Sequence, residues 1–185
     1  MEPIVLVALG IPLILLIALW AIYNSLVKLR YQCREAWSNV DTELKRRYDL
    51  IPNLVATVKG YAAHERSVLE EVTRLRNAAL ASTGSPASQA ADENNLVRAL
   101  RRLLVVVERY PDLKASGQYL DLQRELSNTE DRIQAARRFY NANVRDYNIR
   151  CEQFPSSLVA GPFGFKPEDF FEIEPVEAAA PAVKL

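Results

Sequence analysis

Residues 4–23 form an unbroken run of 20 residues without a charged side chain. A helix of this length, at 1.5 Å per residue, crosses the ~30 Å hydrocarbon core of a bilayer. Trp20 and Tyr23 lie at the end of the run, where aromatic side chains favour the membrane–water interface. No polar stripe marks an exposed face, as a soluble core helix would require. The run therefore predicts a membrane anchor that includes Ile4, Leu13, Leu16, Trp20 and Tyr23.

A cleaved signal peptide is the alternative interpretation of this run. The preceding Met-Glu-Pro has no Lys or Arg, and no A-x-A pattern closes the run, so the sequence favours a retained anchor. Lys28, Arg30 and Arg34 follow the run, and no basic residue precedes it. The positive-inside rule then predicts a single-pass protein with its N-terminus outside and its C-terminal domain in the cytoplasm.

The residues after the anchor number about 160, enough for one domain with a sizeable core. Lys plus Arg equals Asp plus Glu, at 23 each. This balance argues against nucleic-acid binding by bulk electrostatics. Cys33 and Cys151 are far apart in the sequence and form no CxxC motif, so we interpret them as reduced thiols, with a disulfide as the alternative.

Apolar residues recur at helical spacing from residue 24 to about residue 82, and Pro52 interrupts this stretch. Proline lacks a backbone donor, so two structures are compatible with the pattern: one long helix kinked at Pro52, or two helices joined by a tight turn there. The apolar phase continues across Pro52, which favours the kink. A single helix over this range would be roughly 90 Å long, far longer than the other predicted helices, and this mismatch favours the turn.

Two further helices are predicted. Residues 83–91 read as a loop by composition, followed by a helix over 92–110 with Asp92 as its N-cap. The last helix, over 118–153, carries a regular heptad pattern typical of a packing face. We therefore predict an all-α fold in which the anchor precedes an up-and-down four-helix bundle over 24–153. The predicted bundle core contains Trp37, Leu44, Leu54, Leu126, Ile133, Tyr140 and Tyr147.

Residues 154–175 are aromatic, rich in Pro and Gly, and show no helical period, whereas 176–185 are typical of a disordered tail. The aromatic segment is the best candidate for an interaction surface. It can fold back on its own bundle, lie in the lipid interface or dock on another subunit. Its candidate residues are Phe154, Phe163, Phe165, Phe170 and Phe171.

The sequence contains no motif for catalysis or for a cofactor. It has no phosphate-binding glycine loop, no G-x-S-x-G and no H-E-x-x-H. His64 is the single histidine, which excludes di-iron chemistry based on Glu-x-x-His pairs. Acidic pairs such as Glu70–Glu71 and Glu130–Asp131 are interpreted as solvated helix faces. We expect no catalytic, cofactor-binding or metal site, and no enzymatic activity.

Several blocks of the sequence resemble the LemA family. At the N-terminal side the blocks are residues 23–27, 35–38, 46–55, 58–61 and 64–65, and at the C-terminal side they are 136–141, 147–148, 154–155 and 163–165. The resemblance extends from the anchor to about Glu174, although residues 81–110 carry no matching block.

This resemblance implies a single-pass bacterial membrane protein with a four-helix soluble bundle and without a known enzymatic activity. It also implies a frequent association with a membrane zinc protease of the HtpX type, and a branch in magnetosome membrane biogenesis. From the residues themselves we predict a scaffold or a self-associating module at a membrane, and the resemblance implies that this is the bacterial inner membrane. Its expected partners are the lipid bilayer, further copies of itself and another membrane protein. The alternative is an accessory or regulatory subunit of a membrane protease or signalling enzyme.

Overall fold

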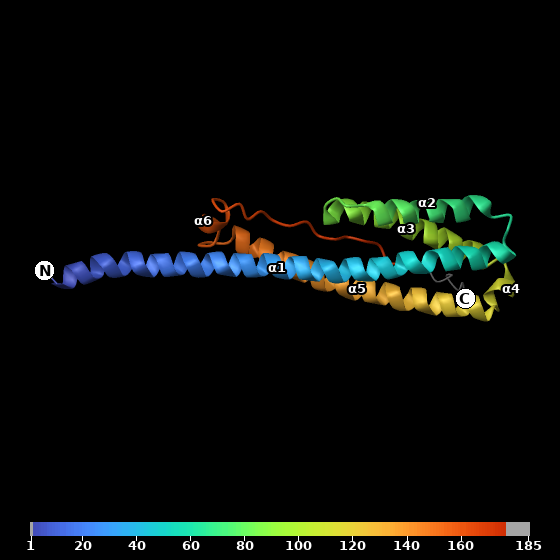
Figure 1. The fold of residues 1–185 in the computed structure, drawn as a ribbon, viewed down its shortest axis with the longest axis horizontal. Coiled ribbons are helices and arrows are strands. Elements are labelled where there is room, and N and C mark those ends of the chain that lie inside the picture. Colours follow the sequence, from blue (N-terminus) through green and yellow to red (C-terminus); the bar gives the residue numbers. More distant parts are fainter. Residues whose placement is uncertain (1, 177–185) are drawn as a thin grey trace, which may run out of the picture. The chain divides into compact units, whose positions relative to one another are not determined.

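The computed structural model describes the backbone of residues 2–176 and the side chains of residues 9–176. Within that range the chain forms six helices and no strand, so the predicted all-α fold is confirmed (Figure 1). The helices are α1 (Glu2–Tyr61), α2 (Arg66–Ala81), α3 (Pro86–Val107), α4 (Pro111–Lys114), α5 (Gly117–Glu152) and α6 (Ser157–Ala160). The side chain of Ile4 and the predicted tail beyond Val176 lie outside the described residues.

The chain divides into two compact units, and α1 and α5 each contribute to both. We call Met1–Trp37 with Tyr140–Glu168 the anchor unit, and Ser38–Phe139 with Asp169–Leu185 the bundle unit. The anchor unit therefore contains the first part of α1, the last part of α5 and α6. The bundle unit contains the remainder of α1 and α5 together with α2, α3 and α4.

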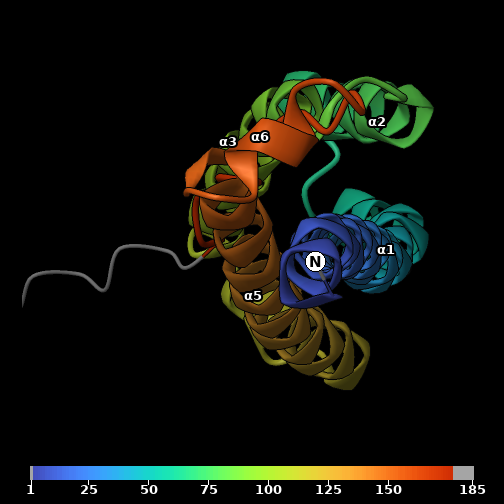
Figure 2. The same ribbon diagram turned by 90° about the vertical axis from the view of Figure 1, so that its left-hand side faces the viewer.

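The apolar run forms the first part of α1. Figure 2 shows this helix from its N-terminal end. The large apolar side chains from Leu9 to Trp20 are between 48% and 69% exposed, and Leu13 and Leu16 are among them. α1 is also the one described helix that is long and apolar enough to cross a membrane, and only 6% of its most apolar window is buried. Leu13, Leu16 and Trp20 of the predicted anchor thus belong to an apolar surface that the described chain leaves uncovered.

The core of the anchor unit forms where the second part of its α1 segment meets α5. Leu26, Cys33 and Ala36 are buried on α1, at spacings of seven and three residues that place them on one face. Buried residues on α5 follow the same helical spacing: Tyr140, Val144, Tyr147 and Cys151. Trp37 is only half-buried, and its ring lies edge-on to that of Tyr140 with a centroid distance of 5.2 Å. Tyr140 and Tyr147 are therefore core residues, whereas Trp37 lies at the edge of the core.

The bundle unit contains four long helical segments, and the short helix α4 is a fifth. Residues 62–65 join α1 to α2, and residues 82–85 join α2 to α3, so consecutive helices run antiparallel (Figure 1). α4 lies within the connection from α3 to α5. The predicted core residues Leu44, Leu54, Leu126 and Ile133 are all buried here.

Of the two structures left open at Pro52, the turn, which the helix lengths favoured, is wrong, because α1 continues as one helix through this residue to Tyr61. Pro52 has no N–H to offer the carbonyl oxygen of Tyr48, four residues earlier. Arg76 on α2 replaces that donor, since its Nε lies 3.0 Å from the Tyr48 oxygen. A side chain from the neighbouring helix thus satisfies the acceptor that the proline leaves open. The first turn of the bundle falls instead at residues 62–65.

The predicted start of the third helical segment at Asp92 is also wrong. The helix begins at Pro86, and the Ser85 hydroxyl accepts a hydrogen bond from the Ser88 amide at 3.4 Å. A Ser at the N-cap followed by Pro at N1 is a favourable helix start, because proline lacks only an N–H that would be unpaired there. Asp92 instead lies inside α3 and accepts a hydrogen bond from the Ser82 hydroxyl.

We predict that the stability cost of replacing Arg76 depends on Pro52. In the native background, Arg76→Met leaves the Tyr48 carbonyl unsatisfied and lowers the free energy of unfolding by about 1–2 kcal/mol. In a Pro52→Ala background the alanine N–H reaches that carbonyl, so the same substitution costs less than about 0.5 kcal/mol. Denaturant unfolding of the full chain in detergent, followed by circular dichroism, measures both. Arg74→Met, an exposed change on the same helix, is the control. Equal costs for Arg76→Met in the two backgrounds would contradict the mechanism.

Candidate functional site

The five phenylalanines predicted as an interaction surface fall into two groups. Phe154, Phe163 and Phe170 expose 79%, 64% and 41% of their surface, respectively. Phe165 and Phe171 are buried within their own units. The two buried rings hold the segment to its own chain, so only the other three are accessible to a partner. Their role as an interaction surface stays a prediction.

The turn after α6 explains why Phe163 and Phe165 have opposite environments. The Phe165 amide donates to the Ala160 carbonyl at 2.9 Å, and the Gly164 amide donates to the Gly161 carbonyl at 3.1 Å. Gly164 has φ of +71°, in the left-handed region that glycine adopts without steric cost. This hydrogen-bond pattern is the one that closes a helix and reverses the chain. It leaves Phe163 outside and returns Phe165 to the core.

Both rings of this turn meet the last residue of the apolar run. The Tyr23 ring centroid lies 5.2 Å from that of Phe163 and 5.5 Å from that of Phe165, both in edge-to-face geometry. The Arg30 guanidinium lies over the Phe165 ring, 4.8 Å from its centroid, within the range of a cation–π interaction. The structure thus brings the end of the predicted anchor together with the aromatic segment, although more than 130 positions separate them in the sequence.

Within the anchor unit, an asparagine side chain holds the end of the aromatic segment. Asn148 donates from Nδ2 to the Glu168 carbonyl at 2.9 Å, and its Oδ1 accepts from the Glu168 amide at 2.8 Å. One edge of a carboxamide presents an N–H donor beside an oxygen acceptor, so it can pair with the N–H and C=O groups of a backbone segment.

The bundle unit uses the same device a few residues later. Asn94 on α3 donates to the Glu172 carbonyl at 3.1 Å and accepts from the Glu174 amide at 2.8 Å. Arg101 adds an ion pair to Glu174 at 2.9 Å and a hydrogen bond to the carbonyl of Pro175. The buried residues along this stretch are Phe171, Ile173 and Val176. Residues 171–176 therefore cover part of the bundle and are held through their backbone. We call this stretch the C-terminal strap.

A buried charge cluster in the bundle unit is the feature that the sequence analysis missed. Arg47 is fully buried and donates to Glu93 on α3 and, at 3.0 Å, to Glu130 on α5. The Tyr48 hydroxyl also donates to Glu93. The prediction that Glu130 belongs to a solvated face is wrong, because its side chain is only 12% exposed. The cluster joins three helices through one guanidinium, and charge spacing along the sequence gives no sign of it.

Burial and charge act in opposite directions on these groups. Burial disfavours the charge on Arg47, but Glu130 and Glu93 more than offset it and hold the pKa of Arg47 above its usual value. Burial raises the pKa of Glu130, although Arg47 acts to lower it. Burial and Glu93 together raise the pKa of Tyr48, which therefore remains a protonated donor at neutral pH. The paired charges describe a structural cluster that ties helices together.

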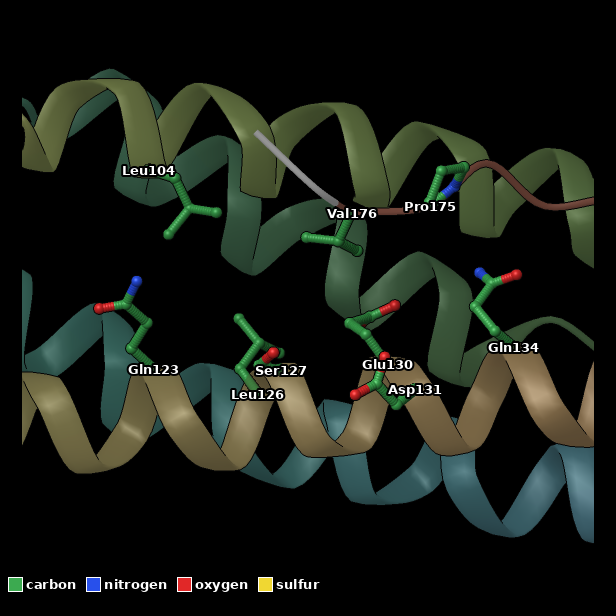
Figure 3. Close-up of a pocket in the computed structure, with 9 residues that line it drawn as sticks. All are labelled: Leu104, Gln123, Leu126, Ser127, Glu130, Asp131, Gln134, Pro175 and Val176. Atoms are coloured by element: carbon green, nitrogen blue, oxygen red, sulfur yellow. The ribbon is translucent and has the colours of Figure 1, made fainter. Parts of the chain in front are cut away.

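Glu130 also borders a pocket of about 210 Å³ in the bundle unit (Figure 3). Residues of α5 form one wall, Leu104 of α3 another, and Pro175 and Val176 of the C-terminal strap a third. In Figure 3 the α5 side chains rise toward the strap. The lining combines a few apolar side chains with amides and carboxylates, and the Glu130 carboxylate is already paired with Arg47, so we assign this pocket no ligand.

The two cysteines and the single histidine lie in different environments. Cys33 and Cys151 are free, buried thiols of the anchor unit. Burial raises the pKa of Cys33 to about 11, with a smaller contribution from Glu168, so this thiol stays protonated at neutral pH. His64 is exposed. Among the described residues, no group of three or more His, Cys, Asp or Glu side chains is arranged to hold a metal ion.

Comparison with known proteins identifies the family of this chain. The model of the LemA family matches residues 36–185. The chain belongs to the LemA family. The predicted family is thereby confirmed. The matched region contains the resembling blocks from residue 36 onward, the buried charge cluster and the whole C-terminal segment.

Among curated proteins, two relatives are magnetosome protein MamQ 1 of Paramagnetospirillum magneticum, 28% identical, and magnetosome protein MamQ of Magnetospirillum gryphiswaldense, 26% identical. Each alignment covers 83% of this chain and 65% of the relative. Protein LemA of Metamycoplasma hominis is 28% identical over 74% of this chain and 63% of its own length. The chain thus spans just under two thirds of the length of these relatives. Neither the family name nor these names describe an enzymatic activity.

We expect Arg47→Ala to be strongly destabilising, with a cost that depends on pH. Removing a partner from a buried ion pair typically costs about 3–5 kcal/mol. Without Arg47, burial raises the pKa of Glu130 further, so the folded state retains a proton that the unfolded state loses. The free energy of unfolding of the variant therefore falls as the pH rises from about 5 to about 8. The stability lost relative to the native protein is greater at about pH 8 than at about pH 5. Arg124→Ala removes an exposed Arg paired with Asp121 and should cost less than about 0.5 kcal/mol. Urea unfolding at both pH values measures these changes, and an equal loss at both would contradict the expectation.

Gly164 and Gly161 provide a matched pair of Gly→Ala substitutions. Gly164→Ala places a Cβ in the left-handed region and should destabilise the turn by about 1–2 kcal/mol. Gly161 has φ of −57°, and its added Cβ would meet only the Ser157 carbonyl at 3.9 Å, so Gly161→Ala should be neutral or slightly stabilising. Thermal unfolding of the two variants compares them, and the idea fails if Gly161→Ala is the more damaging.

Proposed function

We propose that this chain is a non-enzymatic, membrane-anchored helical protein that acts as a scaffold or self-associating interaction module at the bacterial cytoplasmic membrane. The observation that carries the proposal is the continuity of α1, one helix of 60 residues that begins in an uncharged apolar run and ends in the bundle unit. No loop separates the anchor from the segment that packs in the bundle. The role that we propose for a bundle attached in this way is to bind other proteins or further copies of the chain.

Two observations support the membrane anchor, and one supports its orientation. The apolar side chains of the run are largely exposed within the chain, which would be costly in water and is favourable in lipid. Lys28, Arg30 and Arg34 follow the run directly, which favours a cytoplasmic bundle. The relatives named as magnetosome proteins support a role at a membrane.

The proposed contact role is supported by the partners of the polar side chains, which pair within the chain. Arg47, Glu93 and Glu130 form ion pairs inside the bundle. Asn148 and Asn94 pair with the backbone of the C-terminal segment rather than with a ligand. Phe170 and Phe139 expose apolar rings on the bundle unit. Such rings are common anchors of protein interfaces, so further copies of the chain or another membrane protein are the partners we propose.

The mass of the detergent-extracted particle tests the contact role. We expect native mass measurement of the full chain to give a dimer or larger assembly, or a complex with a second protein. Stoichiometric co-purification of a membrane protease would favour the alternative role of an accessory subunit. A strictly monomeric particle without a co-purifying protein would overturn the proposal.

Protease protection tests the orientation. In inside-out vesicles, added protease should remove the bundle and leave a fragment that contains the anchor, whereas right-side-out vesicles should protect the bundle. A periplasmic soluble protein, protected only in the inside-out vesicles, serves as the control for sidedness. Digestion of the bundle in right-side-out vesicles would place it on the outside and refute the orientation.

A further inference from the structure

We propose that the exposed face of residues 154–163 is a second membrane contact, which places Phe154, Leu158 and Phe163 in the lipid headgroup–acyl boundary beside the anchor. The inference rests on the proposed anchor and names lipid as the occupant of this part of the aromatic segment. All of the residues involved belong to the anchor unit.

The composition of the segment is unusual for a surface that faces water. Residues 154–165 contain no charged side chain. Nevertheless Phe154, Leu158 and Phe163 are 79%, 66% and 64% exposed. Exposed large apolar side chains grouped in this way mark a contact surface for protein or membrane.

The position of Phe163 identifies the membrane as the occupant. Its ring packs on Tyr23, the last residue of the apolar run, at a centroid distance of 5.2 Å. Because Tyr23 ends the hydrocarbon-spanning length, Phe163 is held at the level where aromatic side chains favour the membrane–water interface. The exposed face is thus continuous with the lipid-facing surface of the anchor.

The inward side of the same segment fixes this arrangement. Ser156, Val159, Ala160 and Phe165 are buried while Phe154 and Leu158 point away from the core. The Ser156 hydroxyl donates to the Gln153 carbonyl at 3.0 Å, and Asn148 holds the backbone at Glu168. The apolar side chains are therefore presented by an ordered backbone, and little conformational entropy is lost on contact.

Flanking charges set the depth at the interface. Arg30 lies seven residues beyond Tyr23 on α1, about 10 Å along the helix, at the height of the lipid phosphates. Lys166 follows the uncharged segment directly, and the acidic Glu168 comes two residues after it. A basic residue directly after the uncharged segment and an acidic residue beyond it are compatible with a shallow insertion of about 5–10 Å.

Quenching of tryptophan fluorescence by lipids with brominated acyl chains tests this contact. The full chain is reconstituted in phosphatidylcholine vesicles with and without the brominated lipid. The Trp37→Phe variant retains Trp20 and reports on the anchor. Phe154→Trp and Leu158→Trp, each in a Trp20→Phe/Trp37→Phe background, report on the segment.

Tyr31→Trp in the same background is the matched control. Tyr31 is an exposed aromatic residue of the same unit, at 60%, and lies eight residues past Tyr23, about 12 Å farther along α1. Circular dichroism melting verifies that each variant folds like the parent. Two reporters are used so that the result does not depend on one substitution.

We expect Trp20 and both segment reporters to be quenched strongly, with the segment reporters quenched at least about twofold more than the Tyr31→Trp control, because the brominated acyl chains lie below the headgroups. If Trp20 is quenched and the segment reporters match the control, the second contact is refuted and the anchor stands. If Trp20 is not quenched either, the proposed anchor itself fails. Segment reporters that escape the lipid quencher but cross-link to another copy of the chain would also refute the lipid contact, and would assign this face to self-association.

Discussion

A proline inside a helix leaves the carbonyl four residues earlier without its backbone donor, and in this chain Arg76 of the next helix supplies the replacement for Tyr48. The consequence extends beyond one hydrogen bond. Because α1 remains one helix across Pro52, the same element carries the apolar run and contributes to the cores of both compact units. A break at Pro52 would have shortened the helix and moved the first turn of the bundle by about ten residues. The position of that turn, at residues 62–65, determines which faces of α1 and α2 meet.

The interior of the bundle unit combines apolar packing with one charge cluster. Leucine and valine side chains at helical spacing supply the nondirectional part of the stability. Arg47, by contrast, must meet Glu93 and Glu130 with correct geometry, since a buried charge without its partner is strongly unfavourable. We infer that this directional requirement selects one alignment of α1, α3 and α5 among the several that heptad-like apolar faces allow. The raised pKa values of Tyr48 and Glu130 follow from the same burial.

The C-terminal segment is held mainly through its backbone. Asn148 and Asn94 each pair with the main chain at both a carbonyl and an amide, while Phe165, Phe171 and Ile173 supply the apolar contacts. Backbone recognition leaves the outward side chains of the segment free to serve another purpose. This division explains how one aromatic segment contributes both to the core and to an exposed apolar face.

The sequence by itself determined the apolar run, the all-α class and the family, because length without charge, helical periodicity and ordered motif blocks are local properties. It also placed Leu44, Leu54, Leu126 and Ile133 in the core, since a periodic stripe specifies which side of a helix is buried. Only the tertiary structure decided the continuity at Pro52, the burial of Arg47 with its two carboxylates, and the division of the phenylalanines into buried and exposed groups. Each of these depends on a partner that lies from about 28 to more than 130 positions away, such as Arg76 for Tyr48 or Tyr23 for Phe165. Periodicity reports the environment of a side chain averaged over its own helix, and it carries no information about which distant group that side chain meets.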